Sequence, residues 1–425
     1  MKKKNKIALV LEGGGLRGIF TSGVLDCFMD NNITFDYVCG VSAGSCNAFG
    51  YIAGNRGYSK ACMMQTDKNN SFFGVRQMRE SHKYVNLDKV FYDYTQQYGL
   101  DYDKFINSKV KWEFVVTNIE TGKPEYLTSN NIDEALKIGT ASCSLPILTS
   151  PVELNGKLYL DGGMADSVPI QHALDLGYDK VVVVATRRKG SFSKVKKAEE
   201  PIYKQLYKKY PNFLKCVKRR TKLYKEQISL CEKLEEEGKV ILIRPTLPEV
   251  SRLESDVNEL SLSYYHGYTK AEEYIDAIRS SSMSNEELIE LAIEARENAY
   301  APYSHWKVGA ALLCKDGSIY KGCNIENSAF TSTSCAERTA FFAAIADGKL
   351  DFEKIAVVGG DEKAGIVDIV TPCGVCRQVM SEFCDPDEFK IICALTPNNY
   401  KEYSLREMIP NVNFIQSGDG HGFKG

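Results

Sequence analysis

Apolar residues in the first 245 positions fall into short continuous runs, and the segments between them have helical spacing. The runs lie at residues 7–12, 35–41, 112–120, 180–186 and 241–245. After the first run, Val24, Leu25, Phe28 and Met29 repeat at the intervals of one helical face. Apolar strands that alternate with helices predict an α/β fold, in which a parallel sheet is covered by helices on both faces.

A polar break near residue 282 predicts that the chain divides into two domains. Residues 195–280 have a largely helical pattern that ends in the segment 269–279. Serines follow, and Ser284 with Glu287 three positions later gives the pattern of a capping box at a new helix start. We expect a first domain at 1–282, with its motifs in a core at 5–190 and a helical extension at 191–282. We expect a second domain at 283–425.

Composition fits this division into globular domains. The 425 residues are 44% hydrophobic and 25% charged, and no stretch approaches the roughly 18 uncharged apolar residues of a spanning helix. The apolar run Ile7–Leu11 is too short for a signal peptide, so we expect a cytoplasmic protein whose 14 cysteines are reduced. Cysteines that cluster in such a chain indicate metal binding or catalysis.

Charge is distributed unequally between the two parts. The segment Lys180–Lys225 contains 16 basic and two acidic residues, interleaved with aromatic side chains. One interpretation is peripheral contact between residues 180–225 and an anionic membrane. The alternative is a solvated helical face above buried aromatic residues, and binding to nucleic acid is not expected.

A serine in the first domain has the sequence context of a nucleophile. Ser42 lies in Gly-Val-Ser-Ala-Gly at the end of an apolar run, which is the pattern of a nucleophile elbow between a strand and a helix. Asp161, at the end of another strand and before two glycines, is the better candidate base. His172 lies in a helical pattern, and we interpret it as structural.

A glycine loop follows the first predicted strand. Gly13, Gly14 and Gly15 precede Leu16 and Arg17, so the loop formally matches a dinucleotide-binding pattern. The acidic residue that this pattern requires after the next strand is missing, because that strand ends at the serine elbow. An oxyanion hole made by the backbone N–H groups of the three glycines is the better interpretation, and a tight turn without chemistry is the alternative.

These three motifs together resemble the patatin-like phospholipase family. The resemblance rests on GGGLRG, GVSAG and DGG in this order, and it covers roughly residues 5–190. It implies a patatin-like α/β hydrolase fold and a Ser–Asp dyad of Ser42 and Asp161. It also implies lipid or acyl-ester substrates, without fixing which, and a role in lipid degradation.

The second domain concentrates its chemistry in two segments. Cys373 and Cys376 form a Cys-x-x-Cys pair, and Cys335 supplies a third thiolate, which leaves one position open as in a catalytic zinc site. Glu337 is placed to move protons rather than to bind metal, and Pro372 completes the zinc deaminase signature. We therefore expect one Zn²⁺ per chain.

Two arginines adjoin these ligands. Three thiolates on one Zn²⁺ give a formal charge of −1, which weakens the metal as a Lewis acid. Arg338 and Arg377 each lie next to a cysteine of the set, and hydrogen bonds from them to sulfur would offset this charge. The alternative is that both are ordinary surface arginines.

Most of the second domain closely resembles the small, homotetrameric cytidine deaminases. The resemblance is carried by residues 295–313, 322–330, 335–340 and 372–379. It implies a mixed five-stranded sheet between helices, deamination of cytidine or 2′-deoxycytidine in pyrimidine salvage, and a homotetramer. It also implies that Asn324 and Glu326 bind the ribose, and that Phe330 lines the nucleoside pocket. Trp306 stands where a phenylalanine that stacks on the base is usual.

The sequence thus predicts a bifunctional fusion of an acyl hydrolase with a zinc-dependent deaminase. Two alternatives stay open. One domain could be regulatory or binding only, or the deaminase could act on a nucleoside antibiotic such as blasticidin.

Overall fold

The computed structural model describes residues 6–65, 70–82, 84–178, 180–192 and 199–409. Residues 193–198, within the basic segment, lie outside the described part, as do residues 1–5 of the first predicted domain and 410–425 of the second. The described residues divide into two compact units, 6–275 and 276–409. The units divide after Ile275, whereas the boundary predicted at 282/283 lies between the end of helix α12 (Ile275–Ser282) and the start of α13 (Asn285–Glu297) and stays a prediction. The predicted capping box at Ser284 and Glu287 is present.

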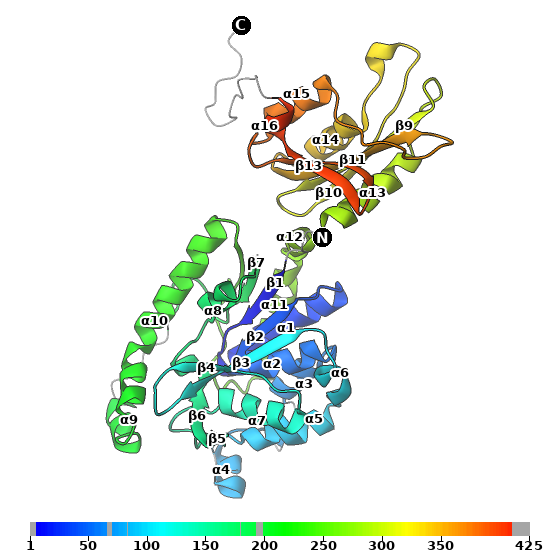
Figure 1. Ribbon diagram of the computed structural model, residues 1–425. Coiled ribbons are helices and arrows are strands. Elements are labelled where there is room, and N and C mark those ends of the chain that lie inside the picture. The colour runs from blue at the N-terminus through cyan, green and yellow to red at the C-terminus, as the bar shows by residue number, and fades with distance from the viewer. Residues whose placement is uncertain (1–5, 66–69, 83, 179, 193–198, 410–425) are drawn as a thin grey trace. The chain divides into compact units, whose positions relative to one another are not determined.

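The first unit is built around an eight-stranded sheet (Figure 1). Along the sheet the order is β5 (Val152–Leu154), β6 (Lys157–Asp161), β3 (Lys111–Asn118), β2 (Tyr37–Val41), β1 (Ile7–Leu11), β7 (Lys180–Val184) and β8 (Val240–Ile243), and β4 (Pro124–Leu127) pairs with β3. The strands from β3 to β8 pair in parallel, whereas β4, β5 and β6 join as antiparallel strands at one edge. The predicted parallel sheet is therefore confirmed, and a short antiparallel edge extends it.

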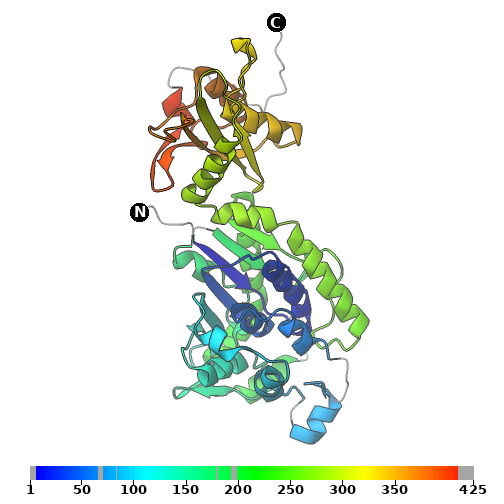
Figure 2. The ribbon, with the colours of Figure 1, turned by 90° about the vertical axis from the view of Figure 1, so that its right-hand side faces the viewer.

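Helices cover both faces of this sheet, as predicted. Successive residues of a strand point to opposite faces, so Ala8 and Val10 pack with one group of helices while Leu9 and Leu11 face the other way. The first group is α8 (Ile170–Asp175) and α10 (Pro211–Glu236). The other face carries α1 (Gly18–Asp30), α2 (Ala43–Ile52) and α11 (Val257–Glu272), and α1 and α11 run side by side (Figure 2).

Shorter elements complete the first unit. They are the 3₁₀ turns η1 (Gly15–Arg17) and η4 (Gly162–Met164), the π-helix Lys89–Asp93, and helices α3 (Tyr58–Met63), α4 (Val75–Ser81), α5 (Tyr94–Gln97), α6 (Tyr102–Ile106), α7 (Ile132–Ser142) and α9 (Glu200–Leu206). Side-chain caps fix two helix starts, because Asn131 accepts from the backbone of α7 and Asp256 from that of α11. Among the described residues, no helix is long and apolar enough to cross a membrane.

The second unit is a mixed five-stranded sheet between helices, which confirms the expected fold. Its order is β10 (Ile319–Cys323), β9 (Trp306–Cys314), β11 (Phe352–Asp361), β12 (Lys390–Thr396) and β13 (Asn399–Ser404). Of these pairs only β11 and β12 run parallel. Helix α13 packs on one face, and α14 (Ala336–Ala346) and α15 (Gly374–Phe383) pack on the other, while α16 (Leu405–Met408) follows β13.

Candidate active sites

Ser42 lies on a sharp turn between β2 and α2. Its backbone is held at φ 53° and ψ −120°, a conformation that costs about 1–3 kcal/mol for a residue other than glycine. The turn needs a small residue next to it, because a Cβ on Gly44 would lie 2.3 Å from the carbonyl oxygen of Leu11. The N–H of Ser42 donates a 3.0 Å hydrogen bond to Oγ of Ser142, which helps to hold the turn in place.

The Ser42 side chain is bound to Asp161. Oγ of Ser42 donates a 2.6 Å hydrogen bond to Oδ2 of Asp161, and Oδ1 of Asp161 accepts one of 2.8 Å from the N–H of Gly163. The Asp161 side chain is almost fully buried at the end of β6. Burial raises the pKa of Asp161 above its ordinary value, and the bond from Ser42 opposes this effect. The pair has the geometry of a nucleophile with an adjacent base.

The glycine loop after β1 lies against the serine. A Cβ on Gly13 would be 2.9 Å from Cβ of Ser42, so the loop backbone approaches the turn directly. Gly15 adopts φ 60°, a left-handed conformation that favours glycine. Within the described part of the chain, the N–H groups of Gly13, Gly14 and Gly15 donate no hydrogen bond, and all three residues line a cavity with Ser42. These donors are available to an oxygen in that cavity.

The three histidines of the first unit lie outside this cavity. Nε2 of His172 is 2.6 Å from Oε2 of Glu113, and its ring stacks on Tyr126. His266 contacts Thr246 and the edge of Phe20, and His82 is exposed. None of them reaches Ser42, so the local chemistry is that of a dyad and not of a triad.

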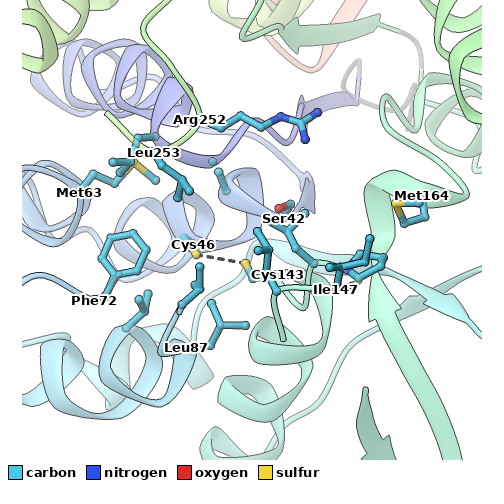
Figure 3. A pocket seen from close by; sticks show the side chains of 18 of the residues that line it. Ser42, Cys46, Met63, Phe72, Leu87, Cys143, Ile147, Met164, Arg252 and Leu253 are labelled. Atoms are coloured by element: carbon cyan, nitrogen blue, oxygen red, sulfur yellow. Dashed lines mark hydrogen bonds between the residues drawn. The ribbon is translucent and has the colours of Figure 1, made fainter. Parts of the chain in front are cut away.

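An apolar cavity of about 260 Å³ opens beside Ser42 (Figure 3). Its lining is mostly apolar and includes Leu16, Met63, Phe72, Val85, Leu87, Leu148, Ile202 and Leu253. Cys46 and Cys143 also line this cavity near the serine, and their Sγ atoms lie 3.3 Å apart. A cavity of this volume and lining suits a hydrocarbon chain that ends at the nucleophile.

A second, smaller cavity of about 40 Å³ lies on the glycine-loop side of Ser42. Four arginines line it: Arg17, Arg187, Arg220 and Arg252. Sequence reasoning singled out only Arg17. The carboxyl ends of parallel strands are where open α/β sheets place their sites, so the position of Arg187 just after β7 was a usable signal. Arg220 on α10 and Arg252 in the loop after β8 carry no local signal.

In the second unit, the structure brings the three predicted metal ligands together. Cys335 and Cys373 are the N-cap residues of α14 and α15, and Cys376 lies in the first turn of α15. Sγ of Cys373 is 3.8 Å from that of Cys335 and 3.5 Å from that of Cys376, and all three sulfurs lie within 4.8 Å of one another. The positive ends of two helices therefore face thiols that must become thiolates to bind metal.

These residues fit a zinc ion. Zn–S bonds of about 2.3 Å in tetrahedral geometry imply sulfur–sulfur distances of about 3.8 Å, close to those observed. Nη2 of Arg338 donates to Sγ of Cys335 at 3.8 Å, and hydrogen bonds from Cys376 and Arg338 lower the pKa of Cys335 to about 5. Nη1 of Arg377 donates instead to the carbonyl of Met408. Nε of Arg338 and Nε of Arg377 are both buried without a hydrogen-bond partner, so within the described residues the bond from these arginines to the sulfurs is the one from Nη2 of Arg338.

Glu337 lies in the first turn of α14, beside the cysteine cluster. Its side chain is buried, and burial is the main cause that raises the pKa of Glu337 to about 7. A carboxyl group with this pKa exchanges protons readily near neutral pH, as general acid–base catalysis requires.

The residues expected around the nucleoside come from the loop after β10 and from the start of β9. Asn324 is buried, accepts a 2.8 Å hydrogen bond from the N–H of Val308 and donates one of 2.8 Å to the carbonyl of Trp306. Oε2 of Glu326 accepts from the N–H groups of Tyr303 and Ser304.

The two aromatic residues of this set are open to solvent. Trp306 is 38% exposed and Phe330 is 88% exposed. Within the described unit, Phe330 therefore leaves almost its whole side chain uncovered.

Two different families match the two parts of the chain, one around Ser42 and Asp161 and the other around the cysteine cluster. Residues 9–174 match the patatin-like phospholipase family, and residues 282–392 match the zinc-binding region of cytidine and deoxycytidylate deaminases. Between them, residues 210–282 match a domain of unknown function.

Individual relatives cover one part or the other. A cytidine deaminase of Sporosarcina psychrophila is 56% identical over 130 residues, which make up 31% of this chain and 91% of that protein. A cytidine deaminase of Halalkalibacterium halodurans is 46% identical over 130 residues, or 31% of this chain and 94% of that protein. The uncharacterized protein YjjU of Escherichia coli (strain K12) is 32% identical over 186 residues, or 43% of this chain and 52% of that protein.

Proposed function

We propose that this chain has two hydrolytic activities. Its second unit belongs to the cytidine deaminase family, and its first contains a patatin-like phospholipase region. The second unit deaminates cytidine and 2′-deoxycytidine, and the first hydrolyses an acyl ester of a lipid. The observation that supports the hydrolase most directly is the hydrogen bond between Ser42 and Asp161 at the junction of two cavities. The deaminase rests on the three clustered thiols beside a buried glutamate.

In the first unit, Ser42 is the nucleophile and Asp161 the base. Oγ of Ser42 attacks the ester carbonyl while Asp161 takes the hydroxyl proton along the existing hydrogen bond. The free N–H groups of Gly13, Gly14 and Gly15 stabilise the negative charge that develops on the carbonyl oxygen. Asp161 gives that proton to the departing alcohol as the ester bond breaks. Ionised again, it activates water, which cleaves the acyl–Ser42 bond and releases the fatty acid from the apolar cavity.

In the second unit, Cys335, Cys373 and Cys376 hold one zinc ion per chain. When bound, the zinc supplies Lewis-acid activation of the attacking water. Glu337 would take a proton from the attacking water at its buried carboxylate and pass it to a ring nitrogen of the pyrimidine, and would then transfer the second proton of that water to the departing amino group, which leaves as ammonia. Arg338 donates to the Cys335 thiolate through Nη2, and the positive charge of Arg377 lies beside Cys376, so both moderate the negative charge of the ligand set.

The nucleoside is held by the loop after β10. Two hydrogen bonds to the backbone fix the side-chain amide of Asn324, so its second N–H and its second oxygen lone pair have a defined direction. The carboxylate of Glu326 is half-buried in the same loop, and together these two groups suit ribose hydroxyls. Trp306 stacks on the base. A ribonucleoside is therefore favoured over a nucleoside antibiotic, and comparing turnover of cytidine with that of blasticidin S tests this choice.

We propose further that the protein is a homotetramer assembled through the second unit. Large side chains of this unit are exposed, among them Phe330, Tyr303, Tyr300, Phe342 and Ile325. An exposed set of this kind is typical of an interface between protein chains. Sedimentation velocity at micromolar concentration distinguishes a tetramer from a monomer.

Two expectations for the first unit also stand as proposals. Tyr203, Tyr207, Phe213 and Tyr224 are buried, so these four aromatic residues of the basic segment belong to the core, whereas Phe192 is exposed. Ile202 and Leu206 on α9 stay exposed, with lysines around them, and we propose that this surface touches anionic membranes. Free thiols at all fourteen cysteines are consistent with a cytoplasmic location.

One experiment tests both activities. The purified full-length protein is assayed with cytidine and with a series of acyl esters, and its zinc content is measured in parallel. Turnover of both substrate types with about one zinc per chain is expected. Turnover of only one type, with zinc bound, would show that the other unit is regulatory or binding only.

A further inference from the structure

The two cavities of the first unit meet at the nucleophile. They share five lining residues: Gly15, Ser42, Leu145, Arg220 and Arg252. In Figure 3 the Arg252 side chain extends above Ser42, whereas Phe72 and Leu87 lie at the opposite end of the apolar cavity. A single substrate can therefore reach from the apolar cavity, past Ser42, into the cationic one.

The smaller cavity gathers positive charge from four separate elements. Arg17 comes from η1, Arg187 from the end of β7, Arg220 from α10 and Arg252 from the loop before α11. Burial of like charges so close together is unfavourable unless anions compensate them. Burial and the neighbouring Arg187 and Arg252 lower the pKa of Arg17 to about 10, which reflects this repulsion.

The protein itself compensates only part of that charge. Two carboxylates line the same cavity, Glu12 and Asp161. Nε of Arg187 lies 3.9 Å from Oε1 of Glu12, although burial raises the pKa of Glu12 and so weakens its negative charge. Nε of Arg220 is bound to the carbonyl of Gly163, and Nε of Arg17 is buried without a partner. Among the lining residues, four guanidinium groups face two carboxylates, an excess of about two positive charges; Glu249, outside the lining, also attracts Arg17 but pairs with Arg188.

We propose that this cavity binds the phosphate of an acyl-ester substrate whose head group is a phosphomonoester, as in phosphatidic or lysophosphatidic acid. The inference rests on the proposed acyl hydrolase. A phosphomonoester carries between one and two negative charges near neutral pH, which matches the excess. Guanidinium groups bind phosphate oxygens in a bidentate manner. The cavity is also small, so it suits a compact anion better than a head group that continues into a choline.

The test compares matched lipids with the wild-type full-length protein. Phosphatidic acid, diacylglycerol and phosphatidylcholine with identical acyl chains are presented in neutral detergent micelles, and p-nitrophenyl butyrate serves as a neutral soluble ester. We expect kcat/KM for phosphatidic acid to exceed that for diacylglycerol by about tenfold or more. Equal values for the two lipids, with the soluble ester hydrolysed, would overturn the inference and leave the hydrolase intact.

Variants locate the effect. Arg187→Gln and Arg252→Gln each remove one charge from the cavity, and the preference for phosphatidic acid over diacylglycerol should fall about tenfold in each. Arg188→Gln is the matched control, because the Arg188 side chain is 51% exposed and pairs with Glu249. An unchanged preference in both cavity variants, in folded protein, would overturn the proposal.

Inorganic phosphate separates a lipid head group from a free anion. We expect 10 mM phosphate to compete with phosphatidic acid and to leave diacylglycerol hydrolysis unaffected. If phosphate instead alters diacylglycerol hydrolysis while phosphatidic acid has no advantage, the cavity binds a regulatory anion and the proposal is wrong. Failure to hydrolyse any ester would overturn the proposed hydrolase, and this inference with it.

Discussion

Ser42 and Asp161 are 119 positions apart in the chain, yet the hydroxyl of one lies 2.6 Å from the carboxylate of the other. Sheet order explains the contact, because β2 ends at the serine turn, β6 ends at Asp161, and only β3 lies between these two strands. Asp161 is fixed further by its own backbone, whose N–H donates to the carbonyl of Ser144 and whose carbonyl accepts from Thr117. The dyad is therefore assembled by the sheet and does not depend on a mobile side chain.

This geometry predicts the pH dependence of ester hydrolysis. Asp161 must be ionised to accept the proton of Ser42, and burial raises its pKa above the ordinary value of about 3.9. As the pH falls through that raised pKa, the carboxylate is protonated and activity is lost. The acid limb of kcat/KM for a neutral ester should therefore lie above pH 4. An acid limb at or below pH 3.9 would contradict the role of a buried Asp161 as base.

Replacing the base without changing its shape should remove most of the activity. Asp161→Asn keeps the volume and can still accept a hydrogen bond, but it cannot take a proton. We expect kcat for ester hydrolysis to fall by about 10²–10⁴-fold. Asp166→Asn is the control, since Asp166 is also buried but its carboxylate binds Tyr126 and Gln227 away from the cavity. Comparable losses in the two variants would mean that the effect is structural.

The serine turn should be sensitive to a single methyl group. Gly44→Ala would put a Cβ at 2.3 Å from the carbonyl oxygen of Leu11, so the first turn of α2 must shift away from β1. We expect a loss of stability of about 1–3 kcal/mol, together with reduced ester hydrolysis. Chemical denaturation followed by circular dichroism measures the first effect. Unchanged stability and activity would show that α2 does not need this close approach.

The cysteine cluster predicts the metal content. Cys373→Ala removes the ligand shared between the two short sulfur–sulfur distances, so zinc should be largely lost from the purified protein. Cys323→Ala is the matched control, because Cys323 is half-buried in the same unit but outside the cluster. Elemental analysis of both variants decides the point. Full retention of zinc in Cys373→Ala would exclude this ligand set.

Much of this architecture could be predicted from the sequence because short local patterns indicate strands, helix starts and the serine turn. Continuous apolar runs marked the parallel strands, and the pair Ser284 and Glu287 marked the start of α13. The positive φ of Ser42 agrees with the nucleophile elbow that the sequence predicts, in which glycines stand two positions before and after the serine. The ligand set Cys335, Cys373 and Cys376 was also indicated by spacing, and the structure brings these three thiols together.

The features that depend on distant parts of the chain could not be read in the same way. Arg187, Arg220 and Arg252 converge only because β7, α10 and the loop after β8 meet above the serine. The antiparallel edge strands β4, β5 and β6 are short, so their patterns were too weak to fix the direction of pairing. The sequence predicted the same role for Arg377 as for Arg338, a hydrogen bond to sulfur, but Nη1 of Arg377 donates to the carbonyl of Met408.

The central claim is that one chain carries two chemically separate active sites, and a crossed assay of Ser42→Ala and Glu337→Gln tests it most directly. Both variants of the full-length protein are assayed for ester hydrolysis and for cytidine deamination, with zinc and folding verified. We expect Ser42→Ala to lose ester hydrolysis and to keep deamination within about twofold, since effects of independent sites are nearly additive. Glu337→Gln should keep zinc and ester hydrolysis and lose deamination by about 10²–10⁴-fold or more. Ester hydrolysis that survives in Ser42→Ala, or deamination that survives in Glu337→Gln, would contradict the account.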